Sequence, residues 1–395
     1  MPKSLRYRYG LRSAHSTGPH GEFFVECCAA TCYDIHKKTP RQAVDKSLEA
    51  VHIFREALQG WLFPSLEAEL GALDEKHRAF VDLCAALHEH FPAARYEWCG
   101  NGKPPESRWS YFKALLAKAF WNFPSTTALI GELAARPVLR RLCGFEDPGD
   151  VPSEGNFSKV FGAFADDGTA QYVFARFIAH AFEGALIHHL LIDSAAVHAR
   201  EKAAVKDPSS PTQESRLAVQ PSRSADENFR DLPAQCDVGV KRNSKGFKES
   251  WRGYKLHVAA SDGDIPVAMW LTSASLHDSQ AAIPLMQKAA EVCPALYDLM
   301  DTAYDAAPIR DYSRSIGSVP IIPVNPRRSP DGAPELEPDR AERFKNRSGI
   351  ERVNSHLEDG HGGRSIYVRG HAKVFLHLAF GILVIAVEQV FKLLE

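Results

Sequence analysis

Residues 251–304, WRGYKLHVAASDGDIPVAMWLTSASLHDSQAAIPLMQKAAEVCPALYDLMDTAY, contain the pattern that decides the fold. KLHVAA and PVAMWLTSA are apolar and β-branched and flank an Asp-Gly turn signal, which predicts two antiparallel strands. HDSQAAIPLMQKAAE then changes to helical spacing. LYDLM predicts a further buried strand that leads into Asp301, and α/β proteins usually place their chemistry at such strand ends. Asp301 is therefore our first candidate catalytic residue.

The composition of this 395-residue chain is that of an ordinary globular protein. A formal net charge of −2 means that any nucleic-acid binding must come from local patches. Eight scattered cysteines do not suggest a disulfide framework and favour a reducing cytosol. The N-terminal residues lack the apolar core of a secretory signal. The C-terminal run FLHLAFGILVIAVEQVFKLL has an uninterrupted apolar part shorter than the ~18–20 residues of a spanning helix, so we expect a buried closing helix.

The first half of the chain is predicted to be an all-helical domain, residues 1–185. Helical spacing is clearest in Thr39–Leu58, Leu62–Phe91, Ser110–Phe120, Ser125–Ala135 and a short helix capped by Ser153. A further helix from Tyr172 is expected to end near His188 and His189, which we interpret as packing residues. Cys28, Cys32 and His36 would share a helix face, but a fourth zinc ligand is missing, so buried thiols are the favoured interpretation.

The second half, residues 186–395, is predicted to be a mixed α/β or α+β domain with a five-stranded sheet flanked by helices. LLID predicts a buried strand that delivers Asp193 at its end, and VPIIPV predicts the last strand. Residues 202–247 are polar and show no period, which indicates a mobile loop. The segment NRSGIERVNSHLED predicts a helix that carries Glu351.

Three acids on such elements could form an oxygen cage for hard divalent ions such as magnesium. Two such ions can activate a water or hydroxyl and stabilise the leaving oxygen of a phosphodiester. The alternative for Asp193 and Asp301 is a strand-end acid that caps a neighbouring helix, and for Glu351 a solvated acid paired to Arg347. Asp278 is expected to cap the helix that follows it.

Four blocks, LLIDSAAVHA, residues 251–286, LMDTAYDAAPIR and NRSGIERVNSHLED, resemble the successive blocks of bacterial insertion-sequence transposases of the DDE type. The resemblance implies a ribonuclease-H-like catalytic domain with Asp193, Asp301 and Glu351 as catalytic and metal-binding residues. It further implies two Mg²⁺ ions, for which Mn²⁺ can substitute, and DNA cleavage at element ends followed by strand transfer. The double-stranded DNA partners would be the terminal inverted repeats and the target.

Around the glutamate, part of this family carries a tyrosine, an arginine, the glutamate and a lysine at fixed helical steps. Arg347 and Glu351 match, and Arg352 follows. Phe344 and Glu358 stand at the tyrosine and lysine places, which puts in doubt the contacts that those two side chains would make with a transposon end.

A basic-aromatic segment before and within the second strand is suited to phosphate contacts and base stacking. Its alternative is a soluble loop. The candidate DNA-binding residues are Lys241, Arg242, Lys248, Trp251, Arg252, Lys255, Arg347 and Arg352.

The sequence therefore favours a cytoplasmic, nucleoid-associated DNA transposase that acts as a homodimer, since paired ends need two subunits. The helical domain would recognise DNA ends or hold the protomers together. Two alternatives are a domesticated DNA-binding protein that does not cut and a metal-dependent phosphohydrolase of small substrates. The intact acidic trio speaks against the first, and the basic-aromatic segment against the second.

Overall fold

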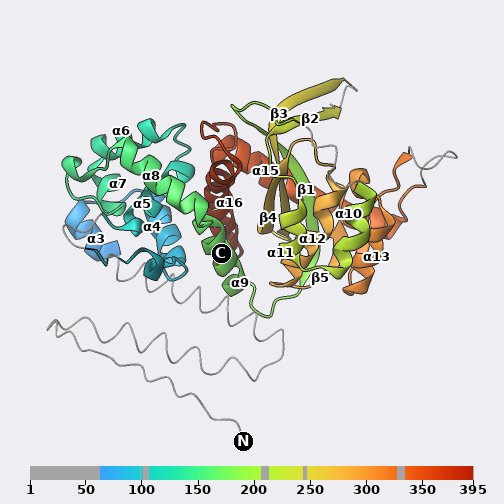
Figure 1. The fold of residues 1–395 in the computed structure, drawn as a ribbon. Coiled ribbons are helices and arrows are strands. Elements are labelled where there is room, and N and C mark those ends of the chain that lie inside the picture. The colour runs from blue at the N-terminus through green and yellow to red at the C-terminus, as the bar shows by residue number, and fades with distance from the viewer. Residues whose placement is uncertain are drawn as a thin grey trace, which may run out of the picture.

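The computed structural model of the chain describes residues 63–97, 99–100, 106–205, 213–242, 247–326 and 334–394. In these ranges helices pack around one mixed sheet, so the fold is α+β. The described chain is helical up to Ala181, and its strands begin at Ile187 (Figure 1). The predicted helix Thr39–Leu58 and the group Cys28, Cys32 and His36 lie outside the described residues.

Short capped helices build the first part of the described chain. They are α3 (Phe63–Leu70), α4 (Glu75–His88), α5 (Arg108–Phe120), α6 (Thr126–Ala135), α7 (Pro137–Leu142), α8 (Glu154–Asp166) and α9 (Thr169–Ala181), with the 3-10 turns η3 (Ala93–Tyr96) and η4 (Pro148–Asp150). Ser125 and Ser153 accept backbone hydrogen bonds and begin α6 and α8, as predicted. The single helix predicted at 62–91 is wrong: Gly71 has a φ of +81° and Asp74 caps a new start.

The sheet has six strands instead of the five predicted. They are β1 (Ile187–His198), β2 (Asp237–Arg242), β3 (Lys248–Ser261), β4 (Ile265–Ser273), β5 (Ala295–Leu299) and β6 (Val319–Ile321). The order is β2-β3-β1-β5-β6, and β4 also pairs with β3. β2 pairs with the first part of β3 and β4 with the second, so β2 and β4 follow one another along the edge opposite β1. β1 is antiparallel to β3 and parallel to β5. His188 and His189 lie in β1, beyond the end of α9, so the predicted helix end near them is wrong.

The segment 202–247, predicted to be a mobile loop, contains ordered elements among its described residues. They are α10 (Gln213–Val219), the turn η5 (Gln220–Ser222), α11 (Ala225–Asp231) and the sixth strand, β2. Ser224 and Glu227 form a capping box that starts α11, and Phe229 of α11 stacks on Trp270 with ring centroids 4.3 Å apart. These elements are too short to show a hydrophobic period, but the capping-box spacing could have revealed α11.

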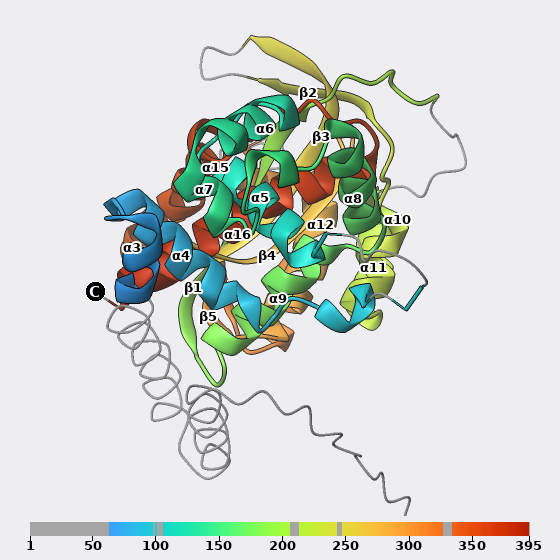
Figure 2. The same cartoon turned by 90° about the vertical axis from the view of Figure 1, so that its left-hand side faces the viewer.

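Helices cover both faces of the sheet. α12 (Ser279–Ala290) packs on β1, β3 and β4, and α10, α11 and α13 (Ala307–Ser315) pack against it. α15 (Ser348–Gly360) packs on β1 and β3, next to α16 (His371–Leu393), which packs on β4. The shorter pieces η6 (Thr302–Tyr304), α14 (Pro338–Phe344) and η8 (Lys345–Arg347) lie in the connections. Figure 2 looks from the side of α3–α9, which lie in front of α16 and the sheet.

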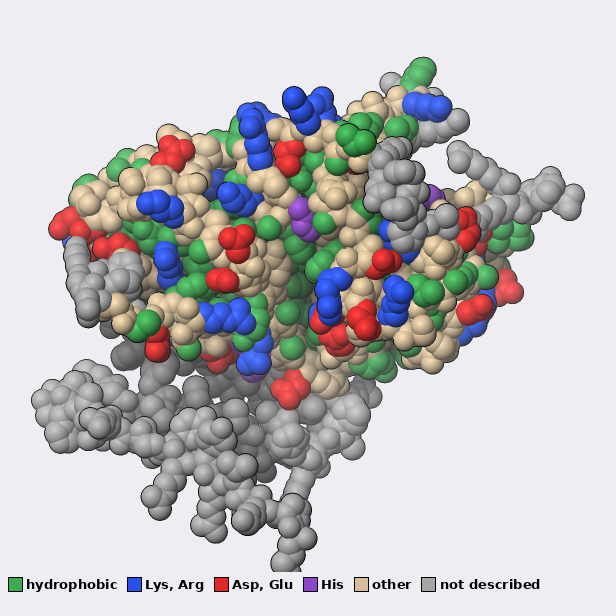
Figure 3. Space-filling model, in the orientation of Figure 1, with side chains coloured by type: hydrophobic (Ala, Val, Ile, Leu, Met, Phe, Trp, Pro, Cys, Tyr) green, Lys and Arg blue, Asp and Glu red, His purple; other side chains and the backbone are tan. Residues whose placement is uncertain are grey.

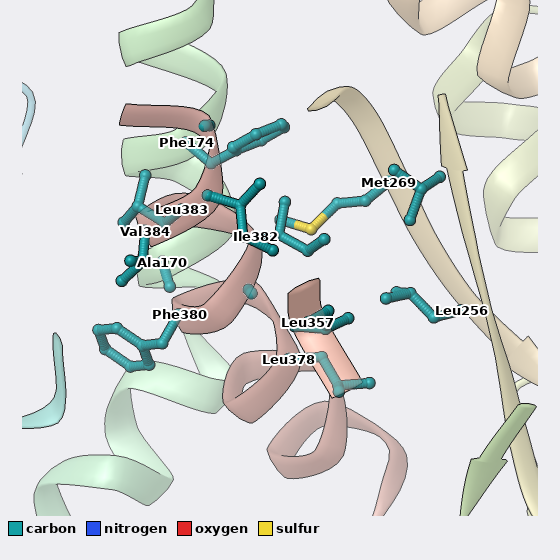
Figure 4. Close-up of a cluster of buried hydrophobic side chains, with 14 of the residues drawn as sticks. Ala170, Phe174, Leu256, Met269, Leu357, Leu378, Phe380, Ile382, Leu383 and Val384 are labelled. Atoms are coloured by element: carbon teal, nitrogen blue, oxygen red, sulfur yellow. The ribbon is translucent and has the colours of Figure 1, made fainter. Parts of the chain in front are cut away.

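α16 is the buried closing helix that the sequence predicts. It contacts α4, α5, α8 and α9 on one side and β4 and α15 on the other. Figure 4 shows Ala170 and Phe174 of α9 on one side of α16, and Met269 and Leu256 of the sheet on the other. Among the described helices, α16 is the one long and apolar enough to span a membrane, yet 89% of its apolar window is buried inside the molecule. That burial is what a core helix shows.

α15 approaches the sheet closely because residue 349 has no side chain. A Cβ at Gly349 would lie 2.7 Å from Oδ1 of Asp264 and 2.8 Å from Cδ1 of Leu191 in β1. Arg352, one turn further on, donates two hydrogen bonds to Asp264, at 2.6 and 2.7 Å. These contacts fix the height and rotation of α15 over β1.

Replacing Gly349 by Val should destabilise the protein by about 1–3 kcal/mol, because the new side chain overfills the α15–β1 contact. Urea unfolding followed by circular dichroism measures this. Gly360→Val is the matched control on the same helix, since a Cβ there meets no described atom within 4 Å. Equal stability of the two variants would contradict the close packing.

Candidate active site

Asp193 and Asp301 extend from corresponding points of two neighbouring strands. The last paired residues of β1 and β5 are Leu191 and Leu299, and each aspartate stands two positions further along its chain. Parallel strands lie about 4.8 Å apart, so the two carboxylates leave the sheet side by side. Asp301 follows the end of β5, as predicted, and its carboxylate accepts a hydrogen bond from the amide of Ala303.

Asp193, in contrast, is not at the end of its strand, and the prediction that it is was wrong. β1 continues to His198 because residues 193–198 keep pairing with residues 253–258 of β3. The parallel neighbour β5 stops first, so Asp193 is supported by β3 on one edge and open on the other. The run AAV after Asp193 and Ser194 contains no turn residue, and this could have indicated that the strand continues.

Glu351 reaches the same place from α15, and one guanidinium lies between the three acids. Nη1 of Arg347 is 2.7 Å from Oε1 of Glu351. Nη2 of Arg347 is 3.0 Å from Oδ2 of Asp193 and 3.9 Å from Oδ2 of Asp301. The structure thus brings together the three acids named from the sequence, along with Arg347. We call Asp193, Asp301, Glu351 and Arg347 the acid cluster.

The electrostatics of the acid cluster favour an additional cation. Burial raises the pKa of Asp193 to about 6, and the carboxylates of Asp301 and Asp278 act in the same direction, whereas Arg347 lowers it. With the three acids ionised, Arg347 balances one of three negative charges. A formal charge of −2 is left, which attracts divalent cations.

Asp278 borders the acid cluster in a role that the sequence did not reveal. We expected its side chain to cap α12, but within the described chain it instead accepts a hydrogen bond from Nζ of Lys255, at 2.8 Å. Lys255 lowers the pKa of Asp278 against the opposing effect of burial. This half-buried pair lies close enough to Asp193 for Asp278 to raise the pKa of Asp193.

Two buried polar atoms at the acid cluster lack hydrogen-bond partners among the described residues. They are the hydroxyl of Tyr304 and Nε of Arg347. The Tyr304 ring is fully buried, and the pKa of its hydroxyl is raised by that burial and by Asp278, Asp193 and Asp301. Buried polar atoms are rarely left unsatisfied, so this environment is suited to a further polar group or ion.

The acid cluster therefore fits a hard divalent cation by its donor set and its charge. Carboxylate oxygens are the ligands that such ions prefer. Within the described residues no three acids, histidines or cysteines already surround a single point at ligand distance. Since the guanidinium of Arg347 lies between the carboxylates, an ion would have to replace it there.

The predicted DNA-binding residues fall into two groups. Lys241, Lys248 and Arg252 are exposed on β2 and β3, and Arg242 ends β2. Trp251, Lys255, Arg347 and Arg352 have partners inside the protein.

Trp251 is not placed for base stacking, contrary to the prediction. It is buried, and its indole N–H donates to the carbonyl of Tyr254 at 3.0 Å. A Cβ at Gly239 would lie 2.4 Å from its ring, so β2 covers one of its faces. Alternation along an extended strand could have placed Trp251 inside, since exposed Arg252 follows it.

Comparisons with known proteins match two parts of the chain to transposase domains. Residues 184–387, just over half of the chain, match the family described as Transposase DDE domain. Residues 71–162, which include α4–α7 and part of α8, match Transposase domain (DUF772).

The chain is also similar to probable transposases for insertion sequence element ISH11 from two strains of Halobacterium salinarum. Each is 27% identical over 179 residues, which cover 40% of this chain and 53% of the relative. The chain thus spans about half the length of these curated relatives. No solved structure matches it.

The region matched to the Transposase DDE domain includes Asp193 in β1, Asp301 after β5 and the helix α15 with Glu351. The second match, in the helical part, is again to a transposase domain. This chain belongs to the DDE transposase family.

Proposed function

We propose that this protein is a transposase that cleaves DNA at the ends of its own element and joins the freed ends to target DNA. The proposal depends on one observation: Asp193, Asp301 and Glu351 all lie around the guanidinium of Arg347. The relatives named as probable insertion-sequence transposases support it.

The topology supports a ribonuclease-H-like catalytic domain within residues 186–395. Counted across the sheet, β4, β3 and β1 are antiparallel neighbours, and β1, β5 and β6 are parallel ones. Residues 1–185 would form a helical domain that recognises DNA ends or holds two protomers together. The closing helix α16 packs against both parts and would hold them together.

Two Mg²⁺ ions, replaceable by Mn²⁺, would be held by Asp193, Asp301 and Glu351. When bound, such ions activate the attacking oxygen and stabilise the leaving oxygen of a phosphodiester. In cleavage, the oxygen of a water bonds to phosphorus, the bond from phosphorus to the 3′-oxygen breaks, and that oxygen takes up a proton. In transfer, the oxygen of the new 3′-hydroxyl bonds to a target phosphorus and loses its proton, the bond from that phosphorus to the target's own 3′-oxygen breaks, and that oxygen takes up a proton.

The protein's own residues would set the geometry of both steps. Pairing with β3 holds Asp193 rigidly, and the edge of β1 that β5 leaves unpaired at this residue would face the substrate. Gly349 lets α15 approach β1 closely and so brings Glu351 to the same point. The guanidinium of Arg347 can pair with a phosphate oxygen as well as with the acids. Exposed Lys241, Lys248 and Arg252 would contact the DNA backbone.

The partners in this proposal are double-stranded DNA, as terminal repeats and as target, and a second copy of the chain. Two ends must be held at once, which a homodimer achieves. The site of action would be the cytoplasm, on the nucleoid.

Replacing Asp301 by Asn should abolish Mg²⁺-dependent cleavage of a DNA fragment that carries the element's ends, while binding of that fragment persists. The amide keeps the shape but removes the ionised ligand. Gel electrophoresis of end-labelled DNA measures cleavage, and a mobility shift measures binding. Asp311→Asn, at an exposed position on α13, is the control. Cleavage by Asp301→Asn would remove the assignment.

Divalent-ion binding should weaken as the pH falls through about 6, because the pKa of Asp193 is about 6 and only the ionised carboxylate binds. Titration calorimetry with Mn²⁺ between pH 5 and 8 measures the affinity. A constant affinity over that range would contradict the raised pKa.

The same group makes the metal-free protein more stable as the pH falls from about 7 to about 4. The pKa of Asp193 is raised above its unfolded value of 3.8, so in this window the folded state binds more protons than the unfolded state. Asp193→Asn should remove this part of the pH dependence in urea unfolding, an effect of order 1–3 kcal/mol.

Replacing Arg347 by Gln should tighten Mn²⁺ binding about tenfold, equivalent to ~1.4 kcal/mol, because the ion no longer competes with a guanidinium. Calorimetry on the metal-free protein measures the dissociation constant. Arg364→Gln is the matched control: it removes the same charge beyond the far end of α15, where Arg364 pairs with Asp359 at 2.8 Å, so the Mn²⁺ affinity should not change. Weaker binding in Arg347→Gln would show that Arg347 supports the ion instead of competing with it.

A further inference from the structure

A second concave site lies beyond the far end of β1 and takes no part in the acid cluster. It is a recess of about 900 Å³. Its walls come from three separate segments: the chain after β1, the start of β3, and the residue before Gly370 and α16. The lining residues are His198, Ala199, Arg200, Glu201, Lys202, Ser250, Trp251, Arg252 and Arg369. We call this site the basic recess.

The basic recess is strongly cationic. Four of its side chains, Arg200, Lys202, Arg252 and Arg369, are exposed and carry a positive charge, whereas Glu201 is its single acidic lining residue. Figure 3 shows Lys and Arg side chains gathered along the upper edge of the molecule, the region where Figure 1 places the upper part of β3 and the loop before α16.

Glu201 is engaged in holding the walls together. Its carboxylate accepts hydrogen bonds from the hydroxyl of Tyr254 in β3, at 3.1 and 3.2 Å, and from the amide of Gly370, at 2.9 Å. The positive charges of the recess therefore exceed this one carboxylate, whose two oxygens already face the protein.

The cations of the recess differ from those at the acid cluster. Arg347 and Arg352 each form ion pairs. Among the ion pairs of the described residues, none includes Arg200, Lys202, Arg252 or Arg369. The guanidinium of Arg200 instead lies 4.2 Å from the ring centroid of Tyr367, which holds it in place without neutralising it. Like charges held together in a concave surface repel one another unless an anion binds there.

The recess stands at a defined position relative to the acid cluster, because β1 connects them. Asp193 and His198 are five residues apart on one strand. At about 3.3 Å per residue, this is ~16 Å. Duplex DNA rises 3.4 Å per base pair, so for a duplex whose axis runs along β1 this length corresponds to about five base pairs.

We propose that duplex DNA runs along β1 and that the basic recess binds its phosphodiester backbone about five base pairs from the phosphate held at the acid cluster. This rests on the proposed transposase function and adds to it a second contact with the same DNA. The cationic side chains contact phosphates, and the lining contains no Asn or Gln of the kind that reads base edges. The recess therefore contributes affinity and register, not sequence recognition.

The first test measures how DNA binding depends on salt in the full-length protein, without divalent ions. Each phosphate contact contributes about 0.9 to the slope of log K against log salt, so Arg200→Gln should lower the slope by about 0.9 and the triple variant with Arg252→Gln and Arg369→Gln by about 2–3. Arg314→Gln, an exposed arginine on α13, is the matched control and should leave the slope unchanged. Thermal melting confirms that each variant is folded. An unchanged slope in the folded triple variant would overturn the inference.

The second test locates the contact on the DNA. Single phosphates are replaced by neutral methylphosphonates at successive positions from the cleavage point. Replacement about five base pairs away should weaken binding by the wild-type protein and leave the triple variant unaffected. Equal sensitivity of both proteins at that position would overturn the inference.

Two further outcomes separate this inference from the proposed function. The wild type could show a steeper salt dependence of DNA binding than the triple variant and yet not cleave DNA in Mg²⁺. That result would support DNA binding by the recess and contradict the transposase function. If the wild type cleaves DNA and the triple variant has the same salt dependence, only the inference of DNA binding by the recess is contradicted. A fluorescent ATP analogue tests whether the recess binds a small nucleotide instead. The inference would also be overturned if the triple variant lost binding of this analogue but kept the wild-type salt dependence of DNA binding.

Discussion

The site depends on one constraint, which is that β1 has two unlike neighbours that end at different heights. β3 pairs with β1 as far as His198, whereas β5 stops at Leu299. Asp193 is therefore held by a full ladder on one edge, and β5 does not pair with it on the other. The loop after β5 brings Asp301 to this unpaired edge. A rigid acid beside a free edge can bind a ligand without reorganisation of its backbone.

The single positive charge of Arg347 does not neutralise the three carboxylates of the acid cluster. Burial makes the ionised form of Asp193 costly, and Arg347 offsets only part of this. Such sites reduce stability in order to bind a charged partner, because preorganised charges avoid reorganisation at the moment of reaction. The Asp278–Lys255 pair lies beside the cluster and is internally neutral, so it shapes the local field without competing for the same cation.

α16 explains how a helical part and a sheet part share one core. Its residues are buried on nearly all sides, between α9 on one face and β4 on the other. A helix that is apolar all round can satisfy two hydrophobic surfaces at once. Because the segment before α16 also supplies Arg369 and binds Glu201 through Gly370, the same helix fixes one wall of the basic recess.

The sequence by itself determined the elements with strong local patterns: the hairpin around the Asp-Gly turn, the helix after Asp278, the strand before Asp301 and the buried closing helix. It also named Asp193, Asp301, Glu351 and Arg347 as candidates from the order of their blocks, and the structure brings these four side chains together. Only the tertiary structure decided that β1 runs past Asp193, that β2 adds a sixth strand, that Trp251 is buried under β2 and that Asp278 pairs with Lys255. These features depend on which segments lie side by side, and pairing between residues tens of positions apart leaves no period in either segment. The basic recess is the clearest case, since its cations come from three segments that meet only in the folded chain.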